Sequence, residues 1–152
     1  MSRIRFANAV FLQCDIQDKF VKTIYRMNSV IHTAKILNKA AGLFKIPLVA
    51  SQQIPKSLGY TVPEVVETYP KGLTTAFDKE RFSMWPEMTD HYKIDKERTE
   101  FVLYGIEAHV CVLQTALDLR SQGFNVYIVT DGVSSSRPLD RSTGLRRMEA
   151  EG

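Results

Sequence analysis

The sequence predicts an α/β fold in which helices cover both faces of a mostly parallel sheet, a Rossmann-like three-layer α/β/α arrangement. Short apolar runs alternate with amphipathic helical segments along the chain. The runs are apolar at consecutive positions, which is typical of strands that are buried on both faces. The chain has 152 residues, of which 44% are hydrophobic, and this suffices for one core but not for two. We therefore expect a single domain over residues 1–152.

Each element is expected from its hydrophobic period and length. The first strand is the apolar run Asn8–Cys14, and Ser29–Phe44 then carries an apolar stripe at helical spacing. The strand Ile46–Ser51 follows that helix almost directly, which is the spacing of a strand–helix–strand unit. The later elements are a helical turn at 62–69, strands at 74–79, 101–106 and 125–133, and helices at 110–123 and 139–152.

Composition excludes several classes of protein. The two cysteines, Cys14 and Cys111, form no CxxC or Cys/His cluster, so neither a disulfide framework nor a structural zinc site is expected. The net charge of +3 is scattered along the chain, which argues against nucleic acid as the main partner. No apolar stretch reaches membrane-spanning length, and no signal or transit peptide is evident. We expect a cytoplasmic protein, with import into mitochondria or another organelle left open.

The segment Glu100–Asp118 reads as a buried strand that runs into a helix whose first turn carries Cys111. The N–H groups and the positive dipole end of such a helix stabilise a thiolate, and they are suited to hold an oxyanion. The alternative is that Cys111 is a small core residue, as most free cysteines are. This segment alone supports both interpretations equally.

Asp15, Lys79 and Cys111 each follow a different predicted strand. Because ligands of such sheets bind beyond the carboxyl ends of the strands, the three side chains are expected at one edge. There the acid could act as general base for the thiol, and the lysine would keep the acid ionised. Taken singly, a helix cap at Asp15 and a solvated charge at Lys79 are the commoner interpretations. Strand alternation places Cys14 opposite Asp15, in the core.

Three motif blocks occur in this order: DIQDKF at 15–20, KERFSMW at 79–85 and GIEAHVCVLQTALD at 105–118. They resemble those of the isochorismatase-like cysteine hydrolases, the superfamily that includes nicotinamidases and N-carbamoylsarcosine amidohydrolases. The nearest likeness is to the eukaryotic isochorismatase domain-containing proteins. The resemblance implies a catalytic triad of Asp15, Lys79 and Cys111. It also implies a cis peptide bond between Ile106 and Glu107, with the Glu107 and Cys111 amides facing an oxyanion.

The chain also departs from the family pattern. Nicotinamidases bind a metal through an Asp-x-His motif after the second strand, where this chain has Gln52 and Gln53, so we expect no metal and no cofactor. Isochorismatase itself does not use the cysteine, and Cys111 therefore favours acyl transfer. Family members usually continue into one more strand and helix. We accordingly expect a sheet that is truncated at its C-terminal edge, and a homo-oligomer that covers this edge.

Four further side chains are candidates for the substrate pocket because they lie near the triad in sequence: Phe20, Phe82, Trp85 and His109. Their ordinary alternatives are core packing for the aromatic rings and helix capping for the histidine. We expect a hydrolase that cleaves an amide-type C–N bond of a small molecule through a thioester. Two alternatives stay open, namely a catalytically silent domain that serves as an interaction or assembly module, and nucleic-acid processing.

Overall fold

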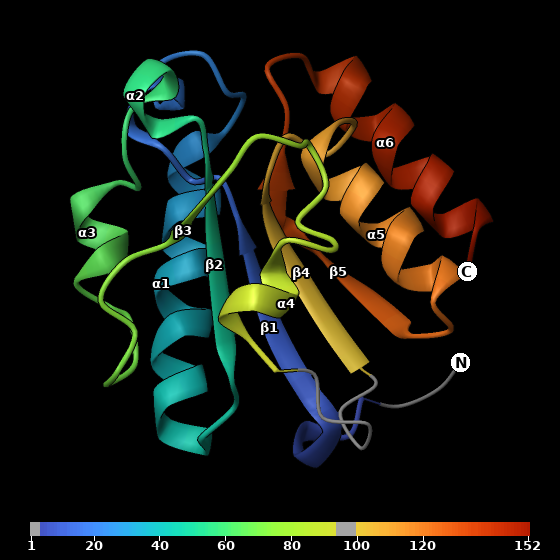
Figure 1. The fold of residues 1–152 in the computed structure, drawn as a ribbon. Coiled ribbons are helices and arrows are strands. Elements are labelled where there is room, and N and C mark those ends of the chain that lie inside the picture. Colours follow the sequence, from blue (N-terminus) through green and yellow to red (C-terminus); the bar gives the residue numbers. More distant parts are fainter. Residues whose placement is uncertain (1–3, 94–99) are drawn as a thin grey trace.

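A five-stranded parallel sheet organises the computed structural model, which describes residues 4–93 and 100–152 (Figure 1). The strands are β1 (Ala9–Cys14), β2 (Leu48–Gln53), β3 (Phe77–Lys79), β4 (Glu100–Ile106) and β5 (Asn125–Ser134). Their order across the sheet is β3-β2-β1-β4-β5, and each neighbouring pair is parallel. The predicted α/β class and parallel sheet are confirmed.

Helices lie on both faces of the sheet (Figure 1). The long helix α1 (Met27–Phe44) covers one face, and α5 (Cys111–Ser121) and α6 (Pro138–Ala150) cover the other. The short elements are η1 (Phe6–Asn8), η2 (Asp18–Phe20), α2 (Pro55–Leu58), α3 (Pro63–Val66) and α4 (Met88–His91). Among the described residues, no helix is long and apolar enough to cross a membrane.

Burial follows the apolar pattern of the strands. Every residue of β1 and of β4 is buried, as consecutive apolar positions predict for central parallel strands. The polar side chains among them are paired. The Tyr104 hydroxyl donates to Asn38 Oδ1 at 2.7 Å, and Asn38 Nδ2 donates to Gln13 Oε1 at 3.0 Å. Strand β5 is more exposed over most of its length because it forms an edge of the sheet.

The strand order places a ligand-binding crevice at the ends of β1 and β4. Strand β1 lies between β2 and β4, so the direction of winding reverses there, and such switch points bind ligands at the carboxyl ends of the strands. Asp15 follows β1 directly, and Cys111 begins α5 after β4. Lys79 ends β3, so its side chain has to extend past the end of β2.

Two glycines allow close backbone contacts around this crevice. Gly105 has a φ of +119°, and a Cβ there would lie 2.0 Å from the Cys14 carbonyl oxygen. A Cβ at Gly144, in α6, would lie 2.5 Å from the Ala108 carbonyl oxygen. Helix α6 therefore packs directly against the turn that leads into Cys111.

Candidate active site

Asp15 and Lys79 form a buried ion pair at the carboxyl edge of the sheet. Lys79 Nζ lies 2.7 Å from Asp15 Oδ2, and the two side chains are 0% and 2% exposed. The Ser51 hydroxyl donates to Asp15 Oδ1 at 2.8 Å. Within the described chain, Asp15 Oδ2 has no donor other than the ammonium group. One carboxylate oxygen is thus held by a neutral hydroxyl, and the other faces the lysine.

The Lys79 ammonium group is enclosed by oxygen atoms of three other residues as well. Its Nζ donates to Gln53 Oε1 at 2.6 Å and to the carbonyl oxygens of Arg81 and Phe82 at 3.0 and 2.9 Å. Gln53 is itself anchored, because its Nε2 donates to the Glu80 carbonyl oxygen at 2.7 Å. The lysine therefore joins the end of β2 and the loop after β3 to the Asp15 carboxylate.

The charge of Lys79 follows from these surroundings. Burial alone lowers the pKa of this side chain, but the acidic groups of Cys14, Asp15 and Cys111 outweigh burial and raise the pKa above its ordinary value of 10.5. The ammonium is consequently charged at neutral pH. Its positive charge stabilises the ionised form of the carboxylate beside it.

Cys111 lies at the N-terminus of α5 and is 8% exposed. Together with Asp15 it lines a cavity of about 210 Å³. The peptide bond between Ile106 and Glu107 is cis, as the family resemblance implies. The predicted nucleophile, acid and lysine therefore come together at one edge of the sheet, from the ends of β1 and β3 and the start of α5.

Two backbone N–H groups near Cys111 are available for a ligand. The N–H groups of Val110 and Val112 donate to the Glu107 carbonyl oxygen at 3.0 and 3.2 Å. In the part of the chain that the structure describes, the N–H groups of Glu107 and Cys111 have no acceptor. Free N–H groups at a helix start are suited to hold a negatively charged oxygen.

Cys14 is fully buried, as predicted, but its thiol lies beside the candidate site rather than away from it. Burial raises the pKa of Cys14 well above its ordinary value of 9.0, and a hydrogen bond with Cys111 and the charge of Asp15 raise it further. The alternation rule fails here because Asp15 has a left-handed backbone with a φ of 49°. That conformation, which aspartate adopts more readily than most residues, ends the regular strand geometry.

Cys111 is expected to react with iodoacetamide before Cys14 does at about pH 7. The reason is that Cys14 is 0% exposed and held protonated by burial, whereas Cys111 borders the cavity. Peptide mass spectrometry after short exposures measures both sites in the same sample. Labelling of Cys14 first, or of Cys111 no faster than a free cysteine, would contradict the assignment of Cys111 as nucleophile.

The remaining walls of the cavity are mostly apolar. The lining residues are Asp15, Phe20, Gln53, Leu58, Phe82, Ile106, Glu107, Val110 and Cys111. Of the four side chains expected in a substrate pocket, Phe20 and Phe82 line this cavity. Trp85 and His109 do not line the cavity. The Trp85 ring packs edge-on against Phe124, with ring centres 6.0 Å apart. The His109 ring instead places its Nδ1 2.9 Å from Ser135 Oγ.

Sequence reasoning missed Gln53, Leu58, Ile106 and Val110 as lining residues. Gln53 could have been found, since it ends β2 and the carboxyl ends of parallel strands share one edge. Leu58 carries no such signal because it lies in the four-residue helix α2. Among the described residues, no group of three or more His, Cys, Asp or Glu side chains is arranged to hold a metal ion.

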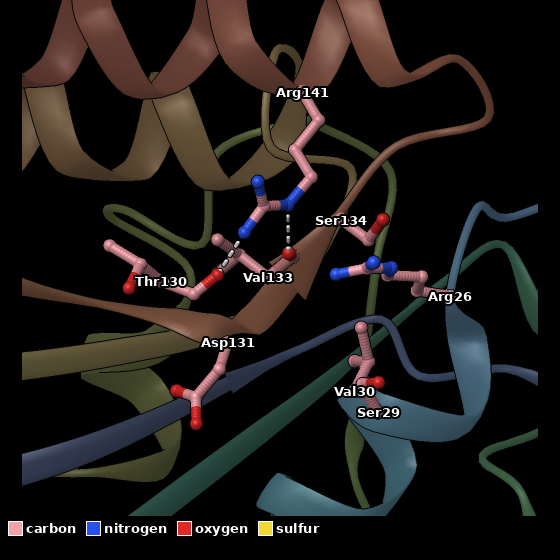
Figure 2. A pocket seen from close by; sticks show the side chains of 8 residues that line it. All are labelled: Arg26, Ser29, Val30, Thr130, Asp131, Val133, Ser134 and Arg141. Carbon is pink, nitrogen blue, oxygen red and sulfur yellow. Dashed lines mark hydrogen bonds between the residues drawn. The ribbon is translucent and has the colours of Figure 1, made fainter.

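A second cavity, of about 160 Å³, lies beside the end of β5 (Figure 2). Arg141 of α6 donates to the carbonyl oxygens of Thr130 and Val133, which ties this helix to the strand. Arg26 extends toward the same space from the start of α1. No cysteine and no lysine–carboxylate pair line this cavity. The cavity at Cys111 is therefore the candidate active site.

Comparison with known proteins identifies the family. The model of the isochorismatase domain matches residues 9–152. This chain belongs to the isochorismatase family. Isochorismatase domain-containing protein 2 of Danio rerio is 37% identical over 153 aligned positions, which cover 100% of this chain and 76% of the relative. The resemblance to the eukaryotic isochorismatase domain-containing proteins is confirmed.

Solved structures of other proteins share the fold. The MAR1 ribonuclease from Caenorhabditis elegans superposes with a TM-score of 0.92 at 41% identity, covering 99% of this chain and 77% of that one. The YcaC protein of Escherichia coli, described as an octameric hydrolase of unknown specificity, superposes with a TM-score of 0.87. It is 20% identical and covers 100% of this chain and 76% of that one, and at this identity the likeness shows the fold alone. The isochorismatase-like fold supports the interpretation that this chain is a hydrolase.

Proposed function

We propose that this protein is a cysteine hydrolase that cleaves the C–N bond of a small amide through a thioester intermediate. The observation that carries the proposal is one cavity lined by both Cys111 and Asp15, with Lys79 paired to the Asp15 carboxylate behind it. A thiol, a base and a group that keeps the base ionised are the parts that nucleophilic acyl transfer requires.

In the first half of the reaction, the Asp15 carboxylate accepts the thiol proton of Cys111, and the sulfur attacks the carbonyl carbon of the amide. The N–H groups of Glu107 and Cys111, which have no acceptor among the described residues, hold the developing oxyanion. When the C–N bond breaks, Asp15 returns the proton to the departing nitrogen. An amine or ammonia leaves, and the acyl group stays on Cys111 as a thioester.

In the second half, Asp15 accepts a proton from a water molecule, whose oxygen attacks the thioester carbonyl carbon. Collapse of this intermediate breaks the C–S bond, the carboxylic acid leaves, and the proton on Asp15 returns to the sulfur. Lys79 takes no part in the proton transfers. It stabilises the ionised state of Asp15 at the start and end of each half-reaction, because its ammonium lies 2.7 Å from Oδ2.

A ribonuclease is the second candidate function. It is favoured by the 41% identity to the Caenorhabditis elegans protein that is described as a ribonuclease. The cavity argues against it, since RNA-binding sites carry basic side chains for the phosphates and none of the lining residues is basic. A catalytically silent assembly module is the third candidate, and an unreactive Cys111 would favour it.

We also propose a homo-oligomer and a cytoplasmic location for this protein. In the described part of the chain, β5 pairs with β4 on one side, and its residues 125–131 are half-buried or exposed. Unpaired edge strands are prone to aggregation unless something covers them. A second copy related by a two-fold axis is the commonest such cover. The Escherichia coli protein that shares the fold is itself described as octameric.

The purified protein is expected to release ammonia and a carboxylic acid from at least one member of a panel of small primary amides. Intact-protein mass spectrometry should detect the acyl adduct, and peptide mapping should place it on Cys111. Chelation by EDTA should leave the rate unchanged, since the described residues contain no group of three or more His, Cys, Asp or Glu side chains arranged to hold a metal ion. Cleavage of RNA without hydrolysis of any amide would favour the ribonuclease, and activity that is lost in EDTA and restored by metal would contradict the mechanism.

A further inference from the structure

The walls of the Cys111 cavity carry acidic groups and no basic ones. Asp15 and Glu107 are among the nine lining residues, and none of the nine is lysine, arginine or histidine. We infer that the site takes small uncharged amides, and that Glu107 makes it reject substrates that carry a carboxylate or phosphate. This inference rests on the proposed cysteine-hydrolase function and specifies its substrate class.

The nearest lysine cannot serve as an anion-binding group. Lys79 Nζ lies within 3.0 Å of four protein oxygen atoms, although an ammonium group has only three protons. Its side chain is 0% exposed. An anionic substrate would have to displace the Asp15 carboxylate, the Gln53 side-chain oxygen or a backbone carbonyl to reach it. The positive charge is therefore neutralised within the protein and is not presented to the cavity.

Glu107 supplies a negative charge that the Asp15–Lys79 ion pair does not neutralise. The group that faces Glu107 at ion-pair distance is His109, whose Nδ1 lies 3.9 Å from Glu107 Oε2 and carries a positive charge only when the ring is protonated. Glu107 Oε2 accepts hydrogen bonds from the Ser136 N–H at 2.7 Å and the Ser136 hydroxyl at 3.0 Å. The side chain is only 24% exposed, so solvent screens it incompletely. At an effective dielectric constant of about 20, a like charge changes an equilibrium about tenfold even at roughly 12 Å. A substrate carboxylate inside the cavity would lie well within that range.

The size and polarity of the cavity agree with this charge selection. Its volume of about 210 Å³ is smaller than the roughly 300 Å³ at which drug-sized ligand sites begin. Side chains of Phe20, Leu58, Phe82 and Val110 form apolar walls. These walls favour a short apolar acyl group, which gains free energy from burial. The reacting amide itself finds its polar partners in the N–H groups of Glu107 and Cys111.

Two alkylating reagents of nearly equal size test the inference directly. Iodoacetamide is uncharged, whereas iodoacetate carries one negative charge, and both alkylate a thiolate. Rates at Cys111 are measured by peptide mass spectrometry and divided by the rates for N-acetylcysteine under the same conditions. Cys111 is expected to prefer iodoacetamide at least about tenfold more strongly than the free thiol does. Glu107→Gln should reduce this excess preference, and the surface variant Glu67→Gln on the C-terminal side of α3 should leave it in place.

The outcomes separate this inference from the proposed function. If Cys111 reacts faster than a free thiol but shows the free thiol's ratio between the two reagents, the charge selection is absent and only this inference is wrong. An unchanged preference in Glu107→Gln would overturn the role of Glu107. If Cys111 reacts with neither reagent faster than N-acetylcysteine and no amide is hydrolysed, the proposed function fails and the inference fails with it.

Discussion

Replacing Cys111 with alanine is expected to lower kcat/KM for amide hydrolysis by at least about 10⁴-fold, the scale of effect seen when a catalytic nucleophile is removed. No other cysteine borders the cavity, because the described chain has only Cys14 besides, and that side chain does not line it. The thioester adduct should disappear together with the activity. The measurement is the rate of ammonia release, with intact-protein mass spectrometry on the same samples.

Cys14→Ala is the matched control for this experiment. It removes the neighbouring thiol, which is fully buried, but it leaves the nucleophile. We expect the adduct to persist in this variant. Thermal unfolding of both variants shows whether the fold is retained. A folded Cys111→Ala variant that hydrolyses amides at the wild-type rate would remove the cysteine mechanism.

Much of the fold was predictable because consecutive apolar residues identify parallel strands that are buried on both faces. The expected strand at Asn8–Cys14 is β1 to within one residue. The expected strand at 74–79 was too long, since β3 is only the three residues Phe77–Lys79 at the edge of the sheet. The helix α4 was not expected, because four residues are too few for a hydrophobic period to appear.

The site was predictable to the extent that strand ends determine it. Asp15 and Cys111 follow strands and Lys79 ends one, and these strands run in one direction, so the convergence of the three residues needed only the parallel sheet. The positions of the aromatic rings depend on tertiary packing that no local pattern encodes. Trp85 packs on Phe124, a residue that is distant in sequence. Its ring contacts Phe124 and is not among the residues that line the cavity.

Replacing Lys79 with methionine is expected to destabilise the protein by about 3–5 kcal/mol, because it leaves the 2%-exposed Asp15 carboxylate without a counter-ion. Urea unfolding of the wild type and the variant measures the difference. Lys35→Met is the matched control, since its ion pair with Glu64 also spans 2.7 Å but is 34% and 52% exposed. Surface pairs of this kind contribute at most about 1 kcal/mol, so the control should unfold nearly as the wild type does.

The pH dependence of this loss has a definite sign. The folded-state pKa of Lys79 is raised above 10.5, so the stabilisation it provides is complete below that pH and is lost as the pH rises through the folded-state value. The difference in unfolding free energy between wild type and Lys79→Met should therefore shrink above about pH 10.5. A double variant, Asp15→Asn with Lys79→Met, should recover part of the lost stability at neutral pH, because no unpaired buried charge is left. If the double variant is as unstable as Lys79→Met alone, packing of the lysine stem rather than the buried ion pair holds this edge of the sheet together.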